Sequence, residues 1–207
     1  MNAKSPVNRR ALFIVIGAAA LIVGLLAALW LQPQATTSLQ SGTLLPQPRA
    51  LPAFSLIDQD GSAFGPAQLQ GHWTLIFPGF TSCPDVCPTT LALLRNVEAG
   101  LGDKAQQLRV AMLSVDPERD TPARLKLYLQ SFSPRFIGIT AAEPQLTEIA
   151  RALGVAYVRV PGASRETYTM DHSAALILLN PRGEIAGYMT PPFDPAKLGA
   201  DLAALIP

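Results

Sequence analysis

The sequence contains a run of 21 residues, Ala11–Leu31, without a single charged side chain. At a rise of about 1.5 Å per residue, a helix of this length spans roughly 30 Å, the thickness of the hydrocarbon core of a bilayer. Basic residues precede the run, and Trp30 lies near its far end, where the membrane interface favours aromatic side chains. The run is therefore predicted to be a single-pass transmembrane anchor, with residues 1–10 in the cytoplasm and the rest of the chain across the membrane.

A cleaved signal peptide is the alternative interpretation of the same run. The apolar stretch of a signal peptide is usually about 7–15 residues long, and this run is longer, although alanines nearby leave cleavage open. The length favours an anchor that is retained. No cysteine directly follows the run, which argues against a lipoprotein.

The anchor also explains the composition of the chain. Hydrophobic residues make up 49% of the 207 residues and charged residues only 15%. Outside the run, roughly 44% of the residues are apolar, an ordinary value for a soluble domain. The net charge of +1 excludes a strongly basic nucleic-acid binder, and the two cysteines exclude a scaffold of several disulfides.

Residues 32–52 have the composition of a linker. They are rich in Gln, Thr, Ser and Pro and carry one charged side chain, Arg49. Such a stretch is expected to be extended and to hold the following domain away from the membrane. The soluble domain is then expected to occupy residues 53–207.

Strand patterns and helix patterns alternate through this domain. Strands are expected at 54–57, 73–77, 109–115, 136–140, 155–160, 174–179 and 185–189. Helices are expected at 89–101, from Pro122 onward, at 143–153 and after Asp194. This order predicts an α/β sandwich around a mixed sheet in the thioredoxin-like arrangement, with a cysteine-containing loop between a central strand and a helix.

The two cysteines, Cys83 and Cys87, are one helical turn apart at the predicted start of a helix. The positive end of a helix dipole stabilises thiolates, and a pair of thiolates can either close a disulfide or hold a soft metal. A structural disulfide or two buried thiols would be the plainer interpretation. Thiol-disulfide oxidoreductases use C-x-x-C, whereas this chain has C-x-x-x-C, a spacing that leaves room for a metal.

His172 lies 85 residues beyond Cys87, just before the strand expected at 174–179. In a thioredoxin-like sheet this position abuts the cysteine loop, where redox enzymes keep a proline that this chain lacks. Two thiolates and one imidazole suit copper, whereas zinc would require a fourth ligand.

The sequence gives less support for other side chains near these positions as metal ligands. Asp85 or Asp171 could supply an oxygen ligand or a supporting hydrogen bond, or could simply be surface carboxylates. His72, at a strand start, is expected to be an ordinary surface or capping residue.

Three stretches of the sequence resemble the SCO/SenC family of membrane-anchored, thioredoxin-fold copper proteins: GFTSCPDVCPTT (79–90), LSVDPERDTP (113–122) and YTMDHSAALILLNPRGEIAGY (168–188). The resemblance implies copper, as Cu(I) or Cu(II), bound by Cys83, Cys87 and His172. It also implies delivery of copper, or of reducing equivalents, to the binuclear copper site of cytochrome c oxidase during its assembly.

The same resemblance implies partners and a location. The partners would be the copper-bearing subunit of cytochrome c oxidase and other periplasmic copper carriers or thiol reductases. The location would be the bacterial inner membrane, with the C-terminal domain in the periplasm. Ser82 and Pro78 depart from the family pattern, and residues 116–120 are expected to form a turn stabilised by local charge pairs.

The leading hypothesis is a copper metallochaperone rather than an enzyme with turnover. The alternative is a thiol-disulfide oxidoreductase acting on periplasmic protein thiols, in which Cys83 and Cys87 form a redox-active disulfide and His172 is dispensable. A peroxidase-like antioxidant of the same fold is a third interpretation.

Overall fold

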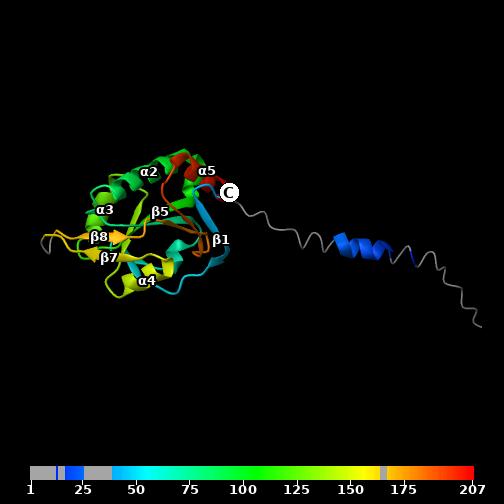
Figure 1. The fold of residues 1–207 in the computed structure, drawn as a ribbon, viewed down its shortest axis with the longest axis horizontal. Coiled ribbons are helices and arrows are strands. Elements are labelled where there is room, and N and C mark those ends of the chain that lie inside the picture. Colours follow the sequence, from blue (N-terminus) through cyan, green and yellow to red (C-terminus); the bar gives the residue numbers. More distant parts are fainter. Residues whose placement is uncertain (1–12, 14–16, 26–38, 164–166) are drawn as a thin grey trace, which may run out of the picture. The chain divides into compact units, whose positions relative to one another are not determined.

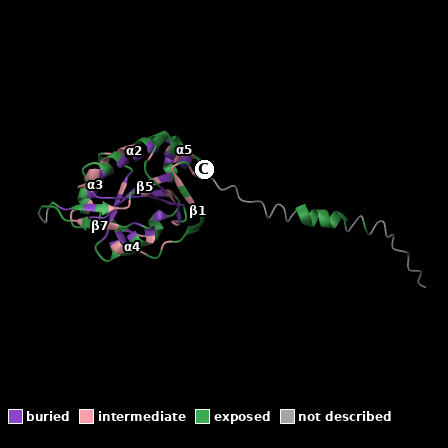
Figure 2. Cartoon of the chain, viewed as in Figure 1, coloured by how far each residue is buried: buried purple, intermediate pink, exposed green. Residues whose placement is uncertain are grey.

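The computed structural model describes residues 13, 17–25, 39–163 and 167–207 and divides the chain into two units, 1–37 and 38–207. In the first unit, residues 17–25 form a helix whose side chains are exposed (Figure 2). The rest of the predicted anchor, apart from Phe13, lies outside the described residues. Among the residues that the structure describes, no helix is both long and apolar enough to cross a bilayer.

The second unit combines strands and helices along its whole length. Within its described part, the strands are β1 (Gly42–Arg49), β2 (Leu56–Asp58), β3 (Ala63–Phe64), β4 (Trp73–Gly79), β5 (Leu108–Ser114), β6 (Ile137–Thr140), β7 (Tyr157–Val160), β8 (Thr169–His172), β9 (Leu176–Leu179) and β10 (Ile185–Met189). The α-helices are α2 (Val86–Gly100), α3 (Pro122–Gln130), α4 (Gln145–Leu153) and α5 (Pro195–Leu205), and 3-10 helices cover Pro66–Leu69 and Gly102–Gln107.

Eight strands form one mixed sheet in the order β1-β10-β9-β4-β5-β6-β2-β3. Strands β4, β5 and β6 run parallel, whereas β9 pairs with β4 in the antiparallel sense. The predicted mixed sheet of a thioredoxin-like fold is confirmed. The predicted strands and helices are also present, with ends that differ by a few residues.

The central strands are buried on both faces and separate two apolar cores. On β4, Leu75 and Phe77 join the core beneath α2, α3 and α5, whereas Ile76 joins the core beneath α4. This alternation follows from the twofold period of a strand, and it explains why the central strands are continuous apolar runs. Figure 1 shows α2, α3 and α5 on one side of the sheet and α4 on the other.

The helix ends follow the predicted capping signals. Thr121 accepts a hydrogen bond from the Arg124 amide at the start of α3, and Asp194 accepts from two amides at the start of α5. Gly154 ends α4 with φ at 77°, in the left-handed region that glycine adopts without strain.

Part of the predicted linker belongs to the sheet. Residues 42–49 form edge strand β1, which pairs with β10 and places Leu44 and Leu45 against the two cores. The four prolines of residues 32–52 suggested a segment without regular pairing, but proline is compatible with an edge strand because one side of that strand needs no ladder hydrogen bonds. The expectation that all of residues 32–52 lie outside the fold was wrong.

Strands β7 and β8 form a separate two-stranded antiparallel sheet beside the main one. Its register pairs Tyr157 with His172. The sequence predicted β7 but placed His172 in a loop, because the segment Thr169–His172 is short and contains Asp, which has low strand propensity. We call β7 and β8 together the His172 hairpin.

Candidate metal centre

Cys83 and Cys87 lie where central strand β4 gives way to helix α2. Residues 80–85, which we call the cysteine loop, connect the two elements, and the Cys83 amide donates to the carbonyl oxygen of Phe80 at 3.2 Å. Cys83 is half-buried and Cys87, the second residue of α2, is fully buried; neither is in a disulfide. The Cys87 amide donates to Cys83 Sγ at 3.3 Å, so the helix N-terminus does face one of the thiols.

His172 approaches the buried thiol from the last position of β8. Its Nε2 lies 4.0 Å from Cys87 Sγ, and its Nδ1 lies 2.9 Å from the carbonyl oxygen of Ser173. Because a carbonyl oxygen can only accept, we assign the proton to Nδ1, which leaves the Nε2 lone pair facing the thiol. This is the tautomer that a metal-binding imidazole requires.

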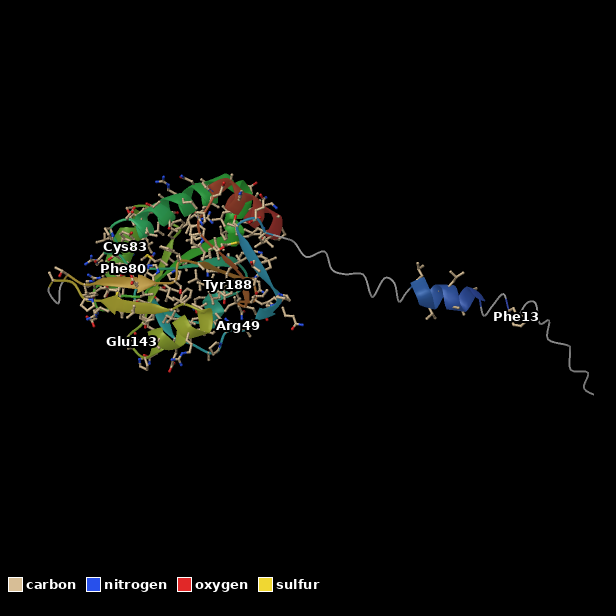
Figure 3. The ribbon with its side chains drawn as sticks, in the orientation of Figure 1. Phe13, Arg49, Phe80, Cys83, Glu143 and Tyr188 are labelled. Atoms are coloured by element: carbon tan, nitrogen blue, oxygen red, sulfur yellow. The ribbon has the colours of Figure 1, made fainter. Side chains whose placement is uncertain are left out.

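The ring of Phe80 lies beside the imidazole. It meets His172 edge to face, with the ring centroids 6.1 Å apart. Phe80 and Cys83 are labelled together in Figure 3, next to the strand that carries His172. The imidazole that faces Cys87 is thus bordered on one side by a buried aromatic ring.

Burial controls the protonation of the inner thiol. Desolvation, with a smaller contribution from Cys83, raises the pKa of Cys87 well above that of a free thiol. Tyr128, on α3, also has a raised pKa because it is half-buried and because ionised Cys87 and Cys83 would repel its phenolate. Cys87 is therefore protonated at neutral pH, and a metal ion that binds it must displace the proton.

A buried carboxylate fixes the cysteine loop to the next strand. Asp120 is fully buried and accepts from the Thr81 amide at 2.9 Å, the Thr81 hydroxyl at 2.5 Å and the Ser114 hydroxyl at 2.7 Å. On the outer side, Arg124 donates to the hydroxyls of Thr81 and Ser82 at 2.7 and 3.0 Å. Ser82, noted above for its departure from the family pattern, thus takes part in holding the loop.

The segment from Asp116 to Asp120 does more than form a turn. The expected local charge pair exists, with Arg119 Nε 2.5 Å from Asp116 Oδ2. Asp116 also accepts from the Tyr168 hydroxyl at 2.6 Å, so the segment reaches both the cysteine loop and the His172 hairpin. Sequence reasoning did not predict that Asp120, Arg119 and Tyr168 support the site. The available signal was the pair of aspartates, Asp116 and Asp120, that follows buried strand β5. This strand lies beside β4, which leads to the two thiols.

The other candidate side chains lie apart from this site. Asp171 is exposed and, by the alternation of β8, points to the face opposite His172. Asp85 is exposed at the start of α2 and accepts only from Thr89, at 3.4 Å. His72 contacts the carbonyl oxygen of Gln70 at 3.3 Å and fits the expected surface role.

The three predicted ligands are brought together in part. Cys87 faces His172, and Cys83 is bonded to the Cys87 amide. Among the described residues, no set of three or more His, Cys, Asp or Glu side chains is gathered closely enough to hold a metal ion as the side chains stand. A three-ligand site therefore requires a rearrangement of side chains, and Cys83 is the less buried of the two thiols.

The fold and the site define a class: a thioredoxin-like domain with two free thiols at a helix N-terminus and an imidazole set against one of them. The family model of SCO1/SenC matches residues 43–207. The chain belongs to the SCO1/SenC family.

Individual relatives agree with this assignment. The chain is 40% identical over 151 residues to a putative copper-binding protein of Stutzerimonas stutzeri, covering 72% of this chain and 73% of that one. It is 39% identical over 132 residues to an SCO2-like protein of Rickettsia conorii, covering 63% of this chain and 64% of that one. The structure of Bradyrhizobium japonicum ScoI with copper bound is similar with a TM-score of 0.69 and 37% identity, covering 74% of this chain and 98% of that one.

Proposed function

We propose that this chain is a copper metallochaperone that binds copper through Cys83, Cys87 and His172. It would hand the ion to the binuclear copper site of cytochrome c oxidase while that enzyme is assembled. The observation that carries the proposal is the approach of His172 Nε2 to Cys87 Sγ, at 4.0 Å, across 85 residues of sequence.

The chemistry of these side chains fits copper. Thiolate sulfur and imidazole nitrogen are both good ligands for copper, and Cu(I) accepts the low coordination number that three side chains provide. The Nδ1–H of His172 is held by a carbonyl oxygen, which fixes the imidazole in the orientation that presents Nε2 to the thiol. Sulfur ligands that must lose protons also make the affinity dependent on pH.

Burial of the thiols suggests how the ion would be released. Cys87 is enclosed, whereas Cys83 is half-buried at the surface of the cysteine loop. A ligand of the receiving protein can therefore reach copper on the side of Cys83 and replace that sulfur first. Such an exchange passes the ion from one protein to the other without releasing it into solution.

The relatives support this cargo and this destination. The Stutzerimonas stutzeri relative is named as copper-binding, and the Bradyrhizobium japonicum structure contains copper. Delivery to cytochrome c oxidase is the role that membership of the family suggests. The proposal places the chain in the bacterial inner membrane through residues 11–31, with the folded domain in the periplasm.

A thiol-disulfide oxidoreductase is the second candidate. The half-buried Cys83, which accepts from the Cys87 amide, is placed as an attacking thiol, with Cys87 one turn away to resolve the mixed disulfide. The two thiols would lose two protons and two electrons and form one disulfide, while one disulfide of the target protein becomes two thiols. His172 has no part in this reaction.

The experiment that tests the proposal is complementation of a strain lacking this gene. Oxidase activity and copper content of the membranes are measured at limiting and at added copper, with the wild-type chain, Cys83→Ser, Cys87→Ser or His172→Ala. The metallochaperone predicts that all three variants fail at limiting copper and that added copper restores part of the activity. Normal oxidase activity with His172→Ala would favour the oxidoreductase, and normal activity in the deletion strain at limiting copper would contradict the metallochaperone.

A further inference from the structure

The His172 hairpin has no ladder pairing with the main sheet in the described part of the chain, where β7 and β8 pair with each other. It is joined to the sheet by the short connection from His172 to β9, and Met170 packs into the core that contains Phe80 and Cys87. Towards α4 the hairpin borders a cavity of about 520 Å³, lined by residues of the hairpin, of α4 and of the segment 115–118. Beyond the connection to β9 and the burial of Met170, the position of His172 relative to the thiols depends on side-chain contacts of the hairpin with the segment 115–120.

The strongest of these contacts converge on Tyr168, directly before β8. Its side chain is buried, its hydroxyl donates to Asp116, and its carbonyl oxygen accepts from Arg119 Nη1 at 2.9 Å. The guanidinium carbon of Arg119 lies 3.7 Å from the centroid of the Tyr168 ring, and that of Arg159 lies 4.1 Å from it. Cation–π contacts are stronger where water is excluded, and of the two guanidinium groups that of Arg119 is the less exposed.

Arg119 also reaches the cysteine loop. Besides its ion pair with Asp116, its guanidinium carbon lies 5.9 Å from the centroid of the Phe80 ring. Phe80 in turn meets His172 edge to face and accepts a hydrogen bond from the Cys83 amide. One guanidinium group thus lies against an aromatic ring of the hairpin and against an aromatic ring of the cysteine loop.

We propose that Arg119 and Tyr168 are positioning residues that clamp the His172 hairpin to the cysteine loop and so set the separation between Nε2 and Cys87 Sγ. Arg119 is a cation and the Tyr168 hydroxyl is bonded to Asp116, so neither is proposed as a copper ligand. The inference rests on the proposed function for its consequence, copper affinity, but the clamp itself is a property of the metal-free protein.

Two further contacts lie at the outer edges of the hairpin. Arg159 pairs with Glu118 at 2.5 Å, with both side chains largely exposed, and Tyr157 bonds to Glu143 and, at 2.9 Å, to Thr147. Exposed ion pairs contribute little to stability. The clamp is therefore assigned to the buried Asp116–Arg119–Tyr168 group rather than to the Arg159–Glu118 pair.

The test uses the full-length chain in detergent, in the reduced state, with isotope-labelled His and Phe rings. Arg119→Lys keeps the charge that neutralises Asp116 but cannot bond Tyr168 and stack on both rings. Tyr168→Leu removes the ring, and Tyr168→Phe keeps it while removing the bond to Asp116. Arg182→Gln, which removes an exposed ion pair with Glu184, is the matched control.

Two measurements are made on each variant: the nuclear Overhauser effect between the Phe80 and His172 rings without metal, and copper affinity by competition with a chelator. We expect Arg119→Lys and Tyr168→Leu to lose the ring contact and to weaken copper binding about tenfold, the scale on which residues that orient a metal ligand act. Tyr168→Phe should lie between these variants and wild type, and Arg182→Gln should match wild type.

An unchanged ring contact in both Arg119→Lys and Tyr168→Leu would overturn the clamp, whatever the copper affinity. If Arg119→Lys does not fold, the two Tyr168 variants decide. If the wild-type chain binds no copper, the proposed function fails, and the ring contact still decides the clamp by itself.

Discussion

The cysteine loop follows central strand β4 and is linked to β5 through hydrogen bonds to Asp120. The described strands of the His172 hairpin have no ladder pairing with the main sheet and join it through the short connection from His172 to β9. The loop is held by a buried carboxylate, Asp120, which accepts two hydrogen bonds from Thr81 of the loop and one from Ser114 of β5. The hairpin is held by side chains, chiefly Arg119 and Tyr168. The backbone that carries the two thiols, the cysteine loop with the start of α2, is thus fixed, and we call it the platform. The imidazole is on an element whose position can be adjusted.

This difference suggests a division of labour in handling a metal. The enclosed Cys87 can retain the ion while an incoming ligand replaces the more accessible Cys83 sulfur and the imidazole moves aside. Regions with few backbone bonds to the core open at lower free energy than central strands do. The comparison predicts different outcomes for changes in the two regions.

The largest effect is expected from the thiols. Cys87→Ser removes the buried sulfur and should lower copper affinity by more than the roughly 100-fold that loss of an orienting residue costs. His172→Ala leaves both sulfurs on their platform and should weaken binding less. Competition with a chelator measures the copper affinity of both variants. A greater loss of affinity in His172→Ala than in Cys87→Ser would contradict this prediction.

The second-largest effect is expected from Asp120, which supports the cysteine loop. Asp120→Asn offers one acceptor oxygen where the buried carboxylate now serves three donors, and unfolding in urea should show a loss of about 2 kcal/mol. The same experiment should show altered copper binding, because Thr81 no longer fixes the loop. A change below about 0.5 kcal/mol would mean that the network does not hold the platform.

The raised pKa of Cys87 predicts a pH dependence. Because copper must displace the thiol proton, apparent affinity should rise by about tenfold per pH unit for each proton displaced. The metal-free protein should lose stability as pH rises above about 8.5, because the unfolded thiol ionises there and the folded one does not. Affinity measured from pH 6 to 8 that stays constant would show that Cys87 is not a ligand.

The smallest effect is expected at the rim of the hairpin. Glu118→Gln breaks the exposed pair with Arg159 and should change stability by less than about 1 kcal/mol. Copper affinity should stay within a factor of about two of wild type, on the same principle. A loss as large as that of Tyr168→Leu would move the positioning role from the buried group to the surface.

The sequence predicts the platform well because its signals are local. Continuous apolar runs identify the central strands, and Thr121, Gly154 and Asp194 fix helix ends through short-range hydrogen bonds and backbone geometry. The two cysteines come directly after such a strand, so their place at the start of α2 follows from the pattern alone.

The His172 hairpin and the contacts that clamp it could not be predicted from local sequence signals. Thr169–His172 has no strong strand signal, and β1 looks like a linker until its pairing with β10 is known. Arg119 and Tyr168 are 49 residues apart, and neither carries a motif that predicts the other as its partner. Contacts of this kind depend on the tertiary arrangement and not on local propensity.

X-ray absorption of the copper-loaded chain tests the central claim most directly, because it counts the ligands by element. We predict two sulfur neighbours and one imidazole nitrogen for wild type, and loss of the nitrogen with both sulfurs retained for His172→Ala. A wild-type spectrum with one sulfur or none would contradict the account, because Cys83 and Cys87 could not then hold the ion together.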